Sequence, residues 1–313
     1  MAIRDAMKKF DLVVVGEIYV DHVLTGFMNW PQPGEEAFAQ NYALELGGGA
    51  AITACALARL GRSVSLIGII GERERAWIHQ RLSDFGVSCT ELRSAGEQTG
   101  ITVSVSSRVD RSFFTYLGAN AQLEDQFADD SLVAHMALAR HVHFAMPITA
   151  RLAKRLLDKL NASHSTTSLD VGHHAAWLQD ADNLQTCSRI DYVLPNEREA
   201  RIICDGEAED YLDFTRIHHW PSGVVKVGAG GAIMRDNGTI LRAVPPSVDT
   251  IDTTGAGDAF NAGFIDGLLD GKDGAECLRR GCVVGGLSTR AAGALRALPT
   301  RDELETCLEE CYG

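Results

Sequence analysis

Residues 251–264, IDTTGAGDAFNAGF, set Gly255, Ala256 and Gly257 directly before an aspartate and a helical pattern. Small residues let a backbone approach a ligand closely, and the first N–H groups of a helix are unpaired and carry partial positive charge. Asp258 stands where this helix begins, so its carboxylate would lie beside donors that suit phosphate. That pairing fits phosphoryl transfer, in which the carboxylate takes a proton from an attacking hydroxyl. Taken alone, the stretch favours a plainer interpretation, a glycine-rich turn with Asp258 interacting with the helix dipole.

The rest of the chain indicates an α/β fold. Strand-like apolar runs alternate with helical patterns over most of the 313 residues, which predicts a doubly wound, mostly parallel sheet flanked by helices. Two segments, about 17–46 and 99–117, have period-2 patterns and turn residues instead. We expect them to form a small accessory sheet, a lid over a site at the edge of the main sheet. No repeat or linker divides the chain, so residues 1–313 are expected to form a single domain.

Composition excludes several classes of function. The formal charge of −13 argues against a grip on DNA or RNA, which needs clustered Lys and Arg. No apolar run approaches the roughly 20 residues of a membrane span, and no signal-peptide pattern precedes the first apolar stretch. The eight cysteines are scattered without a CxxC pair, which favours reduced core thiols. These features predict a cytoplasmic protein that binds neither nucleic acid nor a membrane.

A second glycine-rich entry to a helix occurs at residues 46–61, LGGGAAITACALARLG. Its alanines are typical of close helix packing. Gly47, Gly48 and Gly49 need a further reason, and close approach to a hydroxyl-rich ligand is one.

A third motif, LPNEREA at residues 194–200, places Asn196 and Glu199 three residues apart where a strand passes into a helix. The plain interpretation is an Asn N-cap with Glu199 completing a capping box. The sharper, functional interpretation is that Asn196 and Glu199 bind Mg²⁺ and phosphate through water molecules. The absence of GxxxxGK[ST] excludes a Walker-type NTPase.

Together with KVGAGG (226–231) and GANAQL (118–123), these motifs resemble, in order and spacing, the ribokinase-like (PfkB) carbohydrate kinases. The resemblance extends over essentially the whole chain. It implies the ribokinase-like fold and ATP-dependent phosphorylation of a primary hydroxyl of a sugar or sugar-like molecule. It also implies Asp258 as the catalytic base and the backbone of residues 255–257 as the anion hole.

The resemblance further implies a set of binding residues and Mg²⁺, held through water by Glu199. The nucleotide-binding residues would be Asn196, Glu199, Lys226, Gly228, Gly231, Gly281 and Gly285. The acceptor-binding residues would be Asp21, Gly47, Gly48, Tyr19, Ile52 and Asn120. A monovalent cation such as K⁺ would be held near Asp252, Thr254, Ser288 and Gly293. Exposed lid strands often pair across a two-fold axis, so we also expect a homodimer formed through the lid.

The departures from ribokinase fall mainly in the acceptor pocket. The positions that lose a polar ribokinase side chain are Tyr19, Gly49, Ile52 and one near Met146, and the nearby lid aromatics are Phe113, Phe114 and Tyr116. Losing these polar partners disfavours free ribose as the best acceptor, since each unmade hydrogen bond costs ~1–3 kcal/mol. A more apolar pocket favours an alternative, an adenosine-type nucleoside kinase. A non-catalytic ligand-binding relative is disfavoured, because the base and the anion hole are both present.

Overall fold

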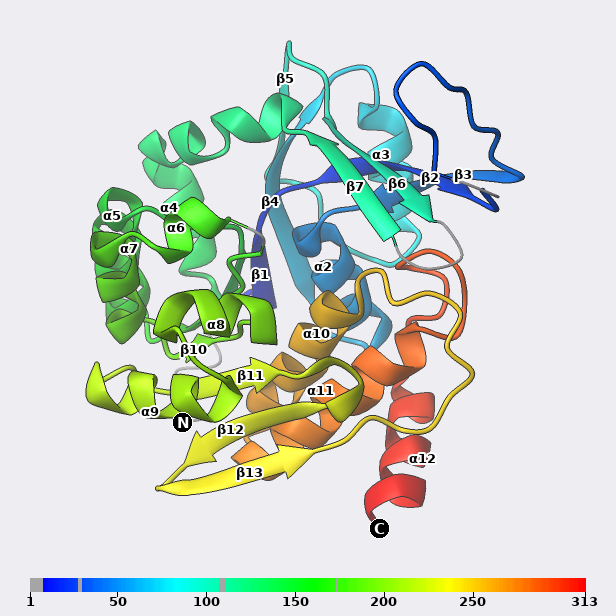
Figure 1. Ribbon diagram of the computed structural model, residues 1–313. Helices are drawn as coiled ribbons and strands as arrows, with labels where there is room; N and C mark the ends of the chain where they lie inside the picture. The colour runs from blue at the N-terminus through cyan, green and yellow to red at the C-terminus, as the bar shows by residue number, and fades with distance from the viewer. Residues whose placement is uncertain (1–7, 28–29, 107–110, 173) are drawn as a thin grey trace.

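The structure is a computed structural model that describes residues 8–27, 30–106, 111–172 and 174–313 (Figure 1). Its main sheet has nine strands in the order β13-β12-β11-β10-β9-β8-β1-β4-β5. The strands are β1 (Phe10–Gly16), β4 (Val64–Gly71), β5 (Leu92–Ala95), β8 (Ala139–Ala145), β9 (Thr166–Leu169), β10 (Tyr192–Val193), β11 (Gly223–Lys226), β12 (Ala232–Asp236) and β13 (Thr239–Ala243). Neighbours from β11 to β5 are parallel, and β12 and β13 join as antiparallel strands. The predicted mostly parallel sheet is confirmed.

Helices cover both faces of this sheet. The α-helices are α2 (Gly49–Arg59), α3 (Arg75–Ser83), α4 (Asp130–Met136), α5 (Ala150–Ala162), α6 (Ala175–Leu178), α7 (Ala181–Thr186), α8 (Glu197–Cys204), α9 (Ala208–Ile217), α10 (Ala256–Leu269), α11 (Gly274–Ser288) and α12 (Arg301–Tyr312). Short 3₁₀ helices are η1 (Gly118–Gln122), η2 (Glu124–Ala128), η3 (Cys187–Arg189) and η4 (Gly228–Gly230). No α-helix in the described ranges is long and apolar enough to cross a membrane.

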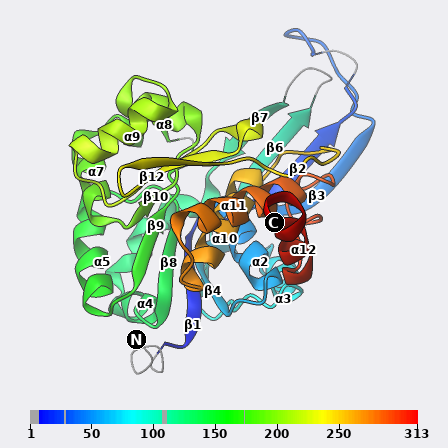
Figure 2. The same ribbon diagram turned by 90° about the horizontal axis from the view of Figure 1, so that it is seen from below.

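Alternation along β1 divides the core between the two faces. Val13 and Val15 pack with buried residues of α4, α5, α6, α8 and α9, whereas Leu12 and Val14 pack with those of α2, α3, α10, α11 and α12. Figure 2 shows β8 and β9 between α5 on one side and α10 on the other. The chain order along the sheet reverses between β1 and β8. In open α/β sheets a ligand binds at such a switch point, beyond the carboxyl ends of the strands.

A second sheet of four strands stands at the edge of the main domain, and we call it the lid sheet (Figure 1). It has the order β3-β2-β6-β7, with β2 (Tyr19–Thr25), β3 (Asn41–Gly47), β6 (Gly100–Ser106) and β7 (Arg111–Tyr116). Apart from Gly47, these strands lie within the two predicted lid segments. The expectation of a small accessory sheet is therefore confirmed.

The register of the lid sheet gives its two faces different chemistry. Asp21 pairs with Thr102, and Thr102 pairs with Thr115, so these polar residues share the inner face. Phe113 shares that face by its spacing from Thr115. The outer face instead carries exposed apolar side chains of β3 and β7, namely Tyr42, Leu44, Phe114 and Tyr116.

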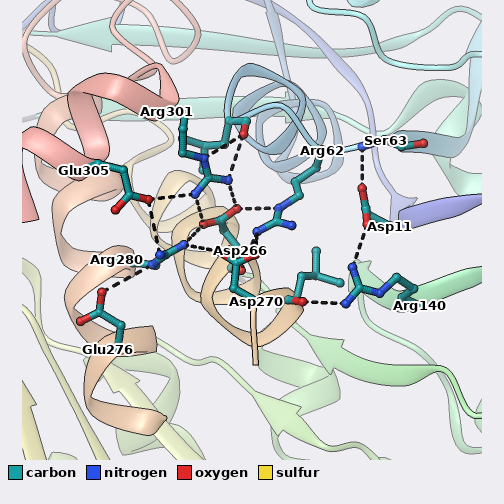
Figure 3. A network of polar contacts seen from close by, with 12 residues as sticks. Asp11, Arg62, Ser63, Arg140, Asp266, Asp270, Glu276, Arg280, Arg301 and Glu305 are labelled. Atoms are coloured by element: carbon teal, nitrogen blue, oxygen red, sulfur yellow. Dashed lines mark hydrogen bonds and ion pairs between the residues drawn. The ribbon is translucent and has the colours of Figure 1, made fainter. Parts of the chain in front are cut away.

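A cluster of charged side chains links several helices near the C-terminal end of α10 (Figure 3). The Asp266 side chain is fully buried and accepts hydrogen bonds from Arg62, at 2.7 Å, and from Arg280, at 2.5 Å. Arg301 of α12 also binds this carboxylate. Asp270 accepts from Arg62 and Arg280 as well. This cluster joins the loop after α2 to α10, α11 and α12.

Candidate active site

A cavity of about 1180 Å³ opens at the carboxyl ends of β1, β8, β9 and β11, at the switch point of the main sheet. Lid strands line one end of it, and the loops before α10 together with α11 line the other. The residues at its centre are Gly49, Asp170, Asn196, Glu199, Lys226, Gly255, Ala256, Gly257 and Asp258. The cavity thus brings together residues from all the predicted motifs except GANAQL.

Asp258 lies in the first turn of α10, beside the predicted anion hole. Gly255 is the N-cap in a left-handed conformation with φ of 74°, which a glycine adopts without strain. The N–H of Ala256 donates to the Thr253 carbonyl at 3.2 Å, and the start of the helix carries the partial positive charge that favours an anion. Burial raises the pKa of Asp258 to about 7, and the charge of Asp170 adds to this rise while Lys226 opposes it. A carboxyl with a pKa near 7 is matched to proton transfer at neutral pH.

The Asp258 carboxylate has room because of Gly49. A Cβ placed on Gly49 would lie 2.8 Å from Oδ1 of Asp258, closer than real Cβ contacts. Any larger residue here would displace the carboxylate. Gly49 therefore holds space for the candidate base, a role that the sequence analysis did not assign to it.

Lys226 is held by two residues that the sequence analysis missed, Asp170 and Asn261. Lys226 Nζ donates to Asp170 Oδ2 at 2.5 Å and to Asn261 Oδ1 at 3.3 Å, and Asn261 Nδ2 donates to Asp170 Oδ2 at 2.6 Å. Burial alone would lower the pKa of Lys226, but Asp170 raises it above the ordinary value; Lys226 in turn lowers the pKa of Asp170 despite burial. The ammonium group is therefore a fixed positive charge.

This positive charge lies at the start of α10. A Cβ on Gly257 would be 3.5 Å from Lys226 Nζ. The ammonium group and the helix N-terminus thus offer adjacent sites for negative charge. Asp170 follows β9 directly, and its place at the carboxyl end of a buried strand was the available sequence signal.

Asn196 and Glu199 form the capping box at the start of α8, as the plain interpretation predicted. Glu199 Oε2 accepts from Asn196 N at 2.9 Å, and Glu199 Oε1 accepts from Asn196 Nδ2 at 2.7 Å. Burial, reinforced by the charge of Asp170, raises the pKa of Glu199 to about 7. Glu199 also lines the cavity, so the capping box does not exclude the sharper interpretation.

The oxygen-rich donor set fits Mg²⁺, which prefers carboxylate oxygen and keeps several waters. Each Glu199 oxygen already accepts one hydrogen bond, so contact through water suits it better than a closed protein cage. Within the described residues no group of three or more His, Cys, Asp or Glu is arranged to hold a metal.

The lid end of the cavity is lined by Glu17, Tyr19, Thr102, Thr115, Leu117, Met146 and His174. Tyr19 donates its hydroxyl to Glu17 Oε2 at 2.7 Å, and His174 Nε2 lies 3.8 Å from Glu17 Oε1. The nearby Glu17 carboxylate raises the pKa of His174. Neither Glu17 nor His174 was identified from the sequence, although Glu17 directly follows a buried strand.

Several predicted acceptor residues lie behind this lining. Ile52 is buried beneath Gly255, because a Cβ on Gly255 would lie 3.0 Å from its Cδ1. Ile52 thus belongs to the core and does not make the pocket more apolar. Asn120 binds both the N–H and the C=O of Ile18, at 3.2 and 2.9 Å. Asp21 packs against Gly47, and burial raises its pKa to about 7.

The lid aromatics also differ from expectation. Phe114 stacks on Trp30, with ring centroids 6.4 Å apart, and Tyr116 donates its hydroxyl to Glu97 at 2.7 Å. Both lie on the outer face of the lid sheet, because β7 alternates and Thr115 lines the cavity. Only Phe113 of the three shares the inner face.

At the other end, the predicted nucleotide-binding glycines divide into two groups. Gly228, Gly231 and Gly285 line the cavity. Gly281 does not belong to the lining. Its missing side chain leaves room for the ring of Phe260, which a Cβ would approach to 2.7 Å, so this glycine serves the packing of α11 on α10.

The predicted cation residues come from two segments, the loop before α10 and the end of α11 with the residues after it. Asp252 Oδ1 accepts from Thr254 N at 2.9 Å and from its hydroxyl at 2.7 Å, while Asp252 Oδ2 accepts from Gly293 N at 2.9 Å. The Asp252 N–H donates to the carbonyl of Thr289, next to Ser288. The loop before α10 is thus joined to the end of α11.

The fold and this site define a nucleotide-dependent phosphotransferase, and comparisons agree. The model for the "pfkB family carbohydrate kinase" matches residues 9–301. A ribokinase of Haemophilus influenzae is 29% identical over 308 residues, 95% of this chain and 98% of the relative. An ATP-dependent ribose-1-phosphate kinase of Halopiger xanaduensis is 30% identical over 306 residues, 92% of this chain and 97% of the relative.

Solved structures agree as well. The Arabidopsis thaliana ribokinase complexed with ribose and ATP superposes with a TM-score of 0.83 at 25% identity, covering 96% of this chain and 99% of that one. The chain therefore belongs to the PfkB family and is an ATP-dependent carbohydrate kinase of ribokinase-like structure.

Proposed function

We propose that the protein transfers the γ-phosphate of ATP to a primary hydroxyl of a sugar or sugar-like molecule, with Asp258 as the catalytic base. The observation that carries this proposal is the half-buried Asp258 carboxylate at the start of α10, beside Lys226 and the space left by Gly49. The acceptor occupies the lid end near Asp21, and ATP occupies the end lined by Gly228, Gly231 and Gly285. Asn120 supports this acceptor end indirectly by fixing Ile18.

Proton transfer and charge stabilisation are divided between two groups. The ionised Asp258 takes the proton of the acceptor hydroxyl as its oxygen attacks the γ-phosphorus, and the bond from that phosphorus to the β–γ bridging oxygen breaks so that ADP leaves. The N–H groups of residues 255–257 and the ammonium of Lys226 stabilise the charge of the transferred group. Mg²⁺, held through water by Glu199, would neutralise nucleotide phosphate charge.

The test is Asp258→Asn, which keeps the shape of the side chain and removes the base. We expect kcat to fall ~10²–10⁴-fold, the contribution of a positioned base, while the Kd for ATP changes little. The measurement is ADP formation together with mass analysis of the phosphorylated product. Wild-type turnover by this variant would contradict the assignment of Asp258.

A nucleoside is the second candidate acceptor. Tyr19 supports it, because its ring lines the cavity and could stack on a base. The apolar lining is smaller than the sequence suggested, since Ile52, Phe114 and Tyr116 lie elsewhere. A panel of sugars and nucleosides distinguishes the two, and activity on nucleosides alone would exclude the sugar.

A monovalent cation between the loop that carries Asp252 and Thr254 and the segment that carries Ser288 and Gly293 is part of this proposal. Such an ion would order the loop that leads into Gly255. Activity should then rise when K⁺ replaces the bulky cation tetramethylammonium, and equal rates in the two salts would exclude the site.

Pairing of two lid sheets into a homodimer is likewise proposed. Its support is the exposed apolar outer face, with Tyr42 60% and Phe114 57% exposed. Sedimentation should give twice the chain mass, and Phe114→Asp should give the monomer. A wild-type monomer at micromolar concentration would reject this interface.

A further inference from the structure

Three acidic residues surround one glycine turn, Gly47 to Gly49, at the lid end of the cavity. A Cβ on Gly47 would collide with the Asp21 carboxylate, and one on Gly49 would lie 2.8 Å from Asp258 Oδ1. A Cβ on Gly48 would meet the backbone of Glu17 and Ile18. The turn therefore packs against the Asp21 and Asp258 carboxylates and the backbone of Glu17, and of these three residues Glu17 and Asp258 line the cavity.

The Glu17 carboxylate is held in place but not saturated. Tyr19 binds one oxygen at 2.7 Å, and His174 approaches the other at 3.8 Å. The Glu17 side chain is only 18% exposed and lines the cavity. A carboxylate has about four acceptor sites, so Glu17 retains acceptor capacity for hydroxyl groups in the cavity.

Positive charge is scarce at this end. Among the described residues that line the cavity, the cationic side chains are Lys226 and, when protonated, His174. Lys226 is bound to Asp170 near the start of α10, and His174 is paired with Glu17. Recognition of a phosphate or carboxylate group normally uses an arginine or lysine, and the described lining offers none there.

We propose that Glu17 is a specificity-determining residue that selects an uncharged, unphosphorylated polyol as the acceptor. Its carboxylate accepts hydrogen bonds from acceptor hydroxyls and, together with the ionised form of Asp258 that catalysis requires, repels an acceptor that carries a phosphate or carboxylate group. An anionic group of such an acceptor would lose its hydration on entering the lid end of the cavity. No lysine or arginine of the described lining would compensate for that loss there. This inference rests on the proposed kinase function and names its substrate class.

Matched pairs of acceptors test the inference on the full-length enzyme. The pairs are ribose with ribose 1-phosphate, fructose with fructose 6-phosphate, and glucose with gluconate. Each anionic member keeps a free primary hydroxyl, so only the added charge distinguishes it as an acceptor. We expect every pair with measurable turnover to favour the neutral member by at least 100-fold in kcat/KM. Preference for a phosphorylated or carboxylated member would overturn the inference and leave the kinase function intact. Phosphorylation of no hydroxyl compound at all would overturn the proposed function itself.

A pair of matched variants isolates Glu17. Glu17→Gln keeps the size of the side chain and removes the charge, so the preference for the neutral member should fall at least tenfold, mainly through a lower KM for the anionic one. Glu97→Gln is the control, because Glu97 also accepts a tyrosine hydroxyl at 2.7 Å but does not belong to the cavity lining. Thermal unfolding verifies that both variants fold. An unchanged preference in Glu17→Gln would refute the role of Glu17.

Discussion

Gly49 and Asp258, 209 positions apart in the chain (258 − 49), are in contact across the site, and the absent side chain of one leaves space for the carboxylate of the other. We expect Gly49→Ala to displace the candidate base and to lower kcat ~10–100-fold, less than its removal would. Steady-state kinetics measure this effect. Gly96→Ala is the control, because a Cβ on Gly96 meets nothing within 4 Å. Equal losses in the two variants would argue against a space-holding role for Gly49.

The rate should depend on pH through Asp258. This carboxyl must be ionised to accept a proton, and its pKa is about 7, so kcat/KM should rise with pH and level off above about 7. Burial is the largest cause of the raised pKa of Asp258, and Asp170 is the neighbouring charge that raises it most. Asp170→Asn removes that charge and leaves Lys226 without its acidic partner. The acid limb should then move to lower pH. The measurement is the pH profile of kcat/KM for wild type and for Asp170→Asn. If the rise of kcat/KM occurred at the same pH in both, it would belong to a group other than Asp258.

Lys226 and Asp170 should be strongly coupled in stability. Lys226→Met leaves Asp170 buried without its partner, which costs about 3–5 kcal/mol of unfolding free energy. The double change Lys226→Met with Asp170→Asn removes both charges and should be less destabilising than Lys226→Met alone. Urea unfolding of the four proteins gives the coupling energy, and additive effects would mean that the two groups are independent.

Asp266 should support the fold without affecting catalysis. It is buried beneath Arg62, Arg280 and Arg301, so Asp266→Asn should lower the unfolding free energy by about 3–5 kcal/mol. The exposed pair Arg189–Asp158 provides the control, since Asp158→Asn should cost less than about 1 kcal/mol. Chemical denaturation measures both. Below the transition, KM values of Asp266→Asn should match wild type, because the cluster lies at the far end of α10.

His141 should make the protein less stable in acid. Burial, together with His143, lowers the pKa of His141 to about 3, whereas an unfolded histidine titrates near 6.5. Below about pH 6.5 the unfolded chain binds a proton that the folded protein does not, so unfolding free energy falls by up to about 1.4 kcal/mol per pH unit.

His141→Gln tests this linkage. When pH falls from 7 to 5, wild type should lose more unfolding free energy than the variant, because the variant lacks the histidine that takes up a proton on unfolding. His164→Asn, at an exposed turn, should leave the pH dependence of wild type unchanged. If His141→Gln showed the same pH slope as wild type, His141 would not be the source.

Much of the fold and part of the site could be predicted from local sequence. Alternating patterns predicted both sheets, because strand and helix periods are properties of a few consecutive residues. Asp170 and Asn261 escaped notice because they meet Lys226 across 56 and 35 residues, and no local pattern marks such a meeting. Ile52 was misplaced for a related reason. Its helix has apolar residues on every side, so sequence alone could not tell which side faces the cavity.

The lid sheet is joined to the main domain at closely spaced crossings. Gly48 packs against the backbone of Glu17 and Ile18, Gly118 packs against that of Gln98, and Asn120 binds Ile18. The inner lid residues therefore stand on a separate sheet, while the phosphate end of the site is built from α10 and the ends of the main-sheet strands. In evolutionary terms, substitutions on the lid sheet can change which acceptor is bound and leave the residues that transfer the phosphate in place.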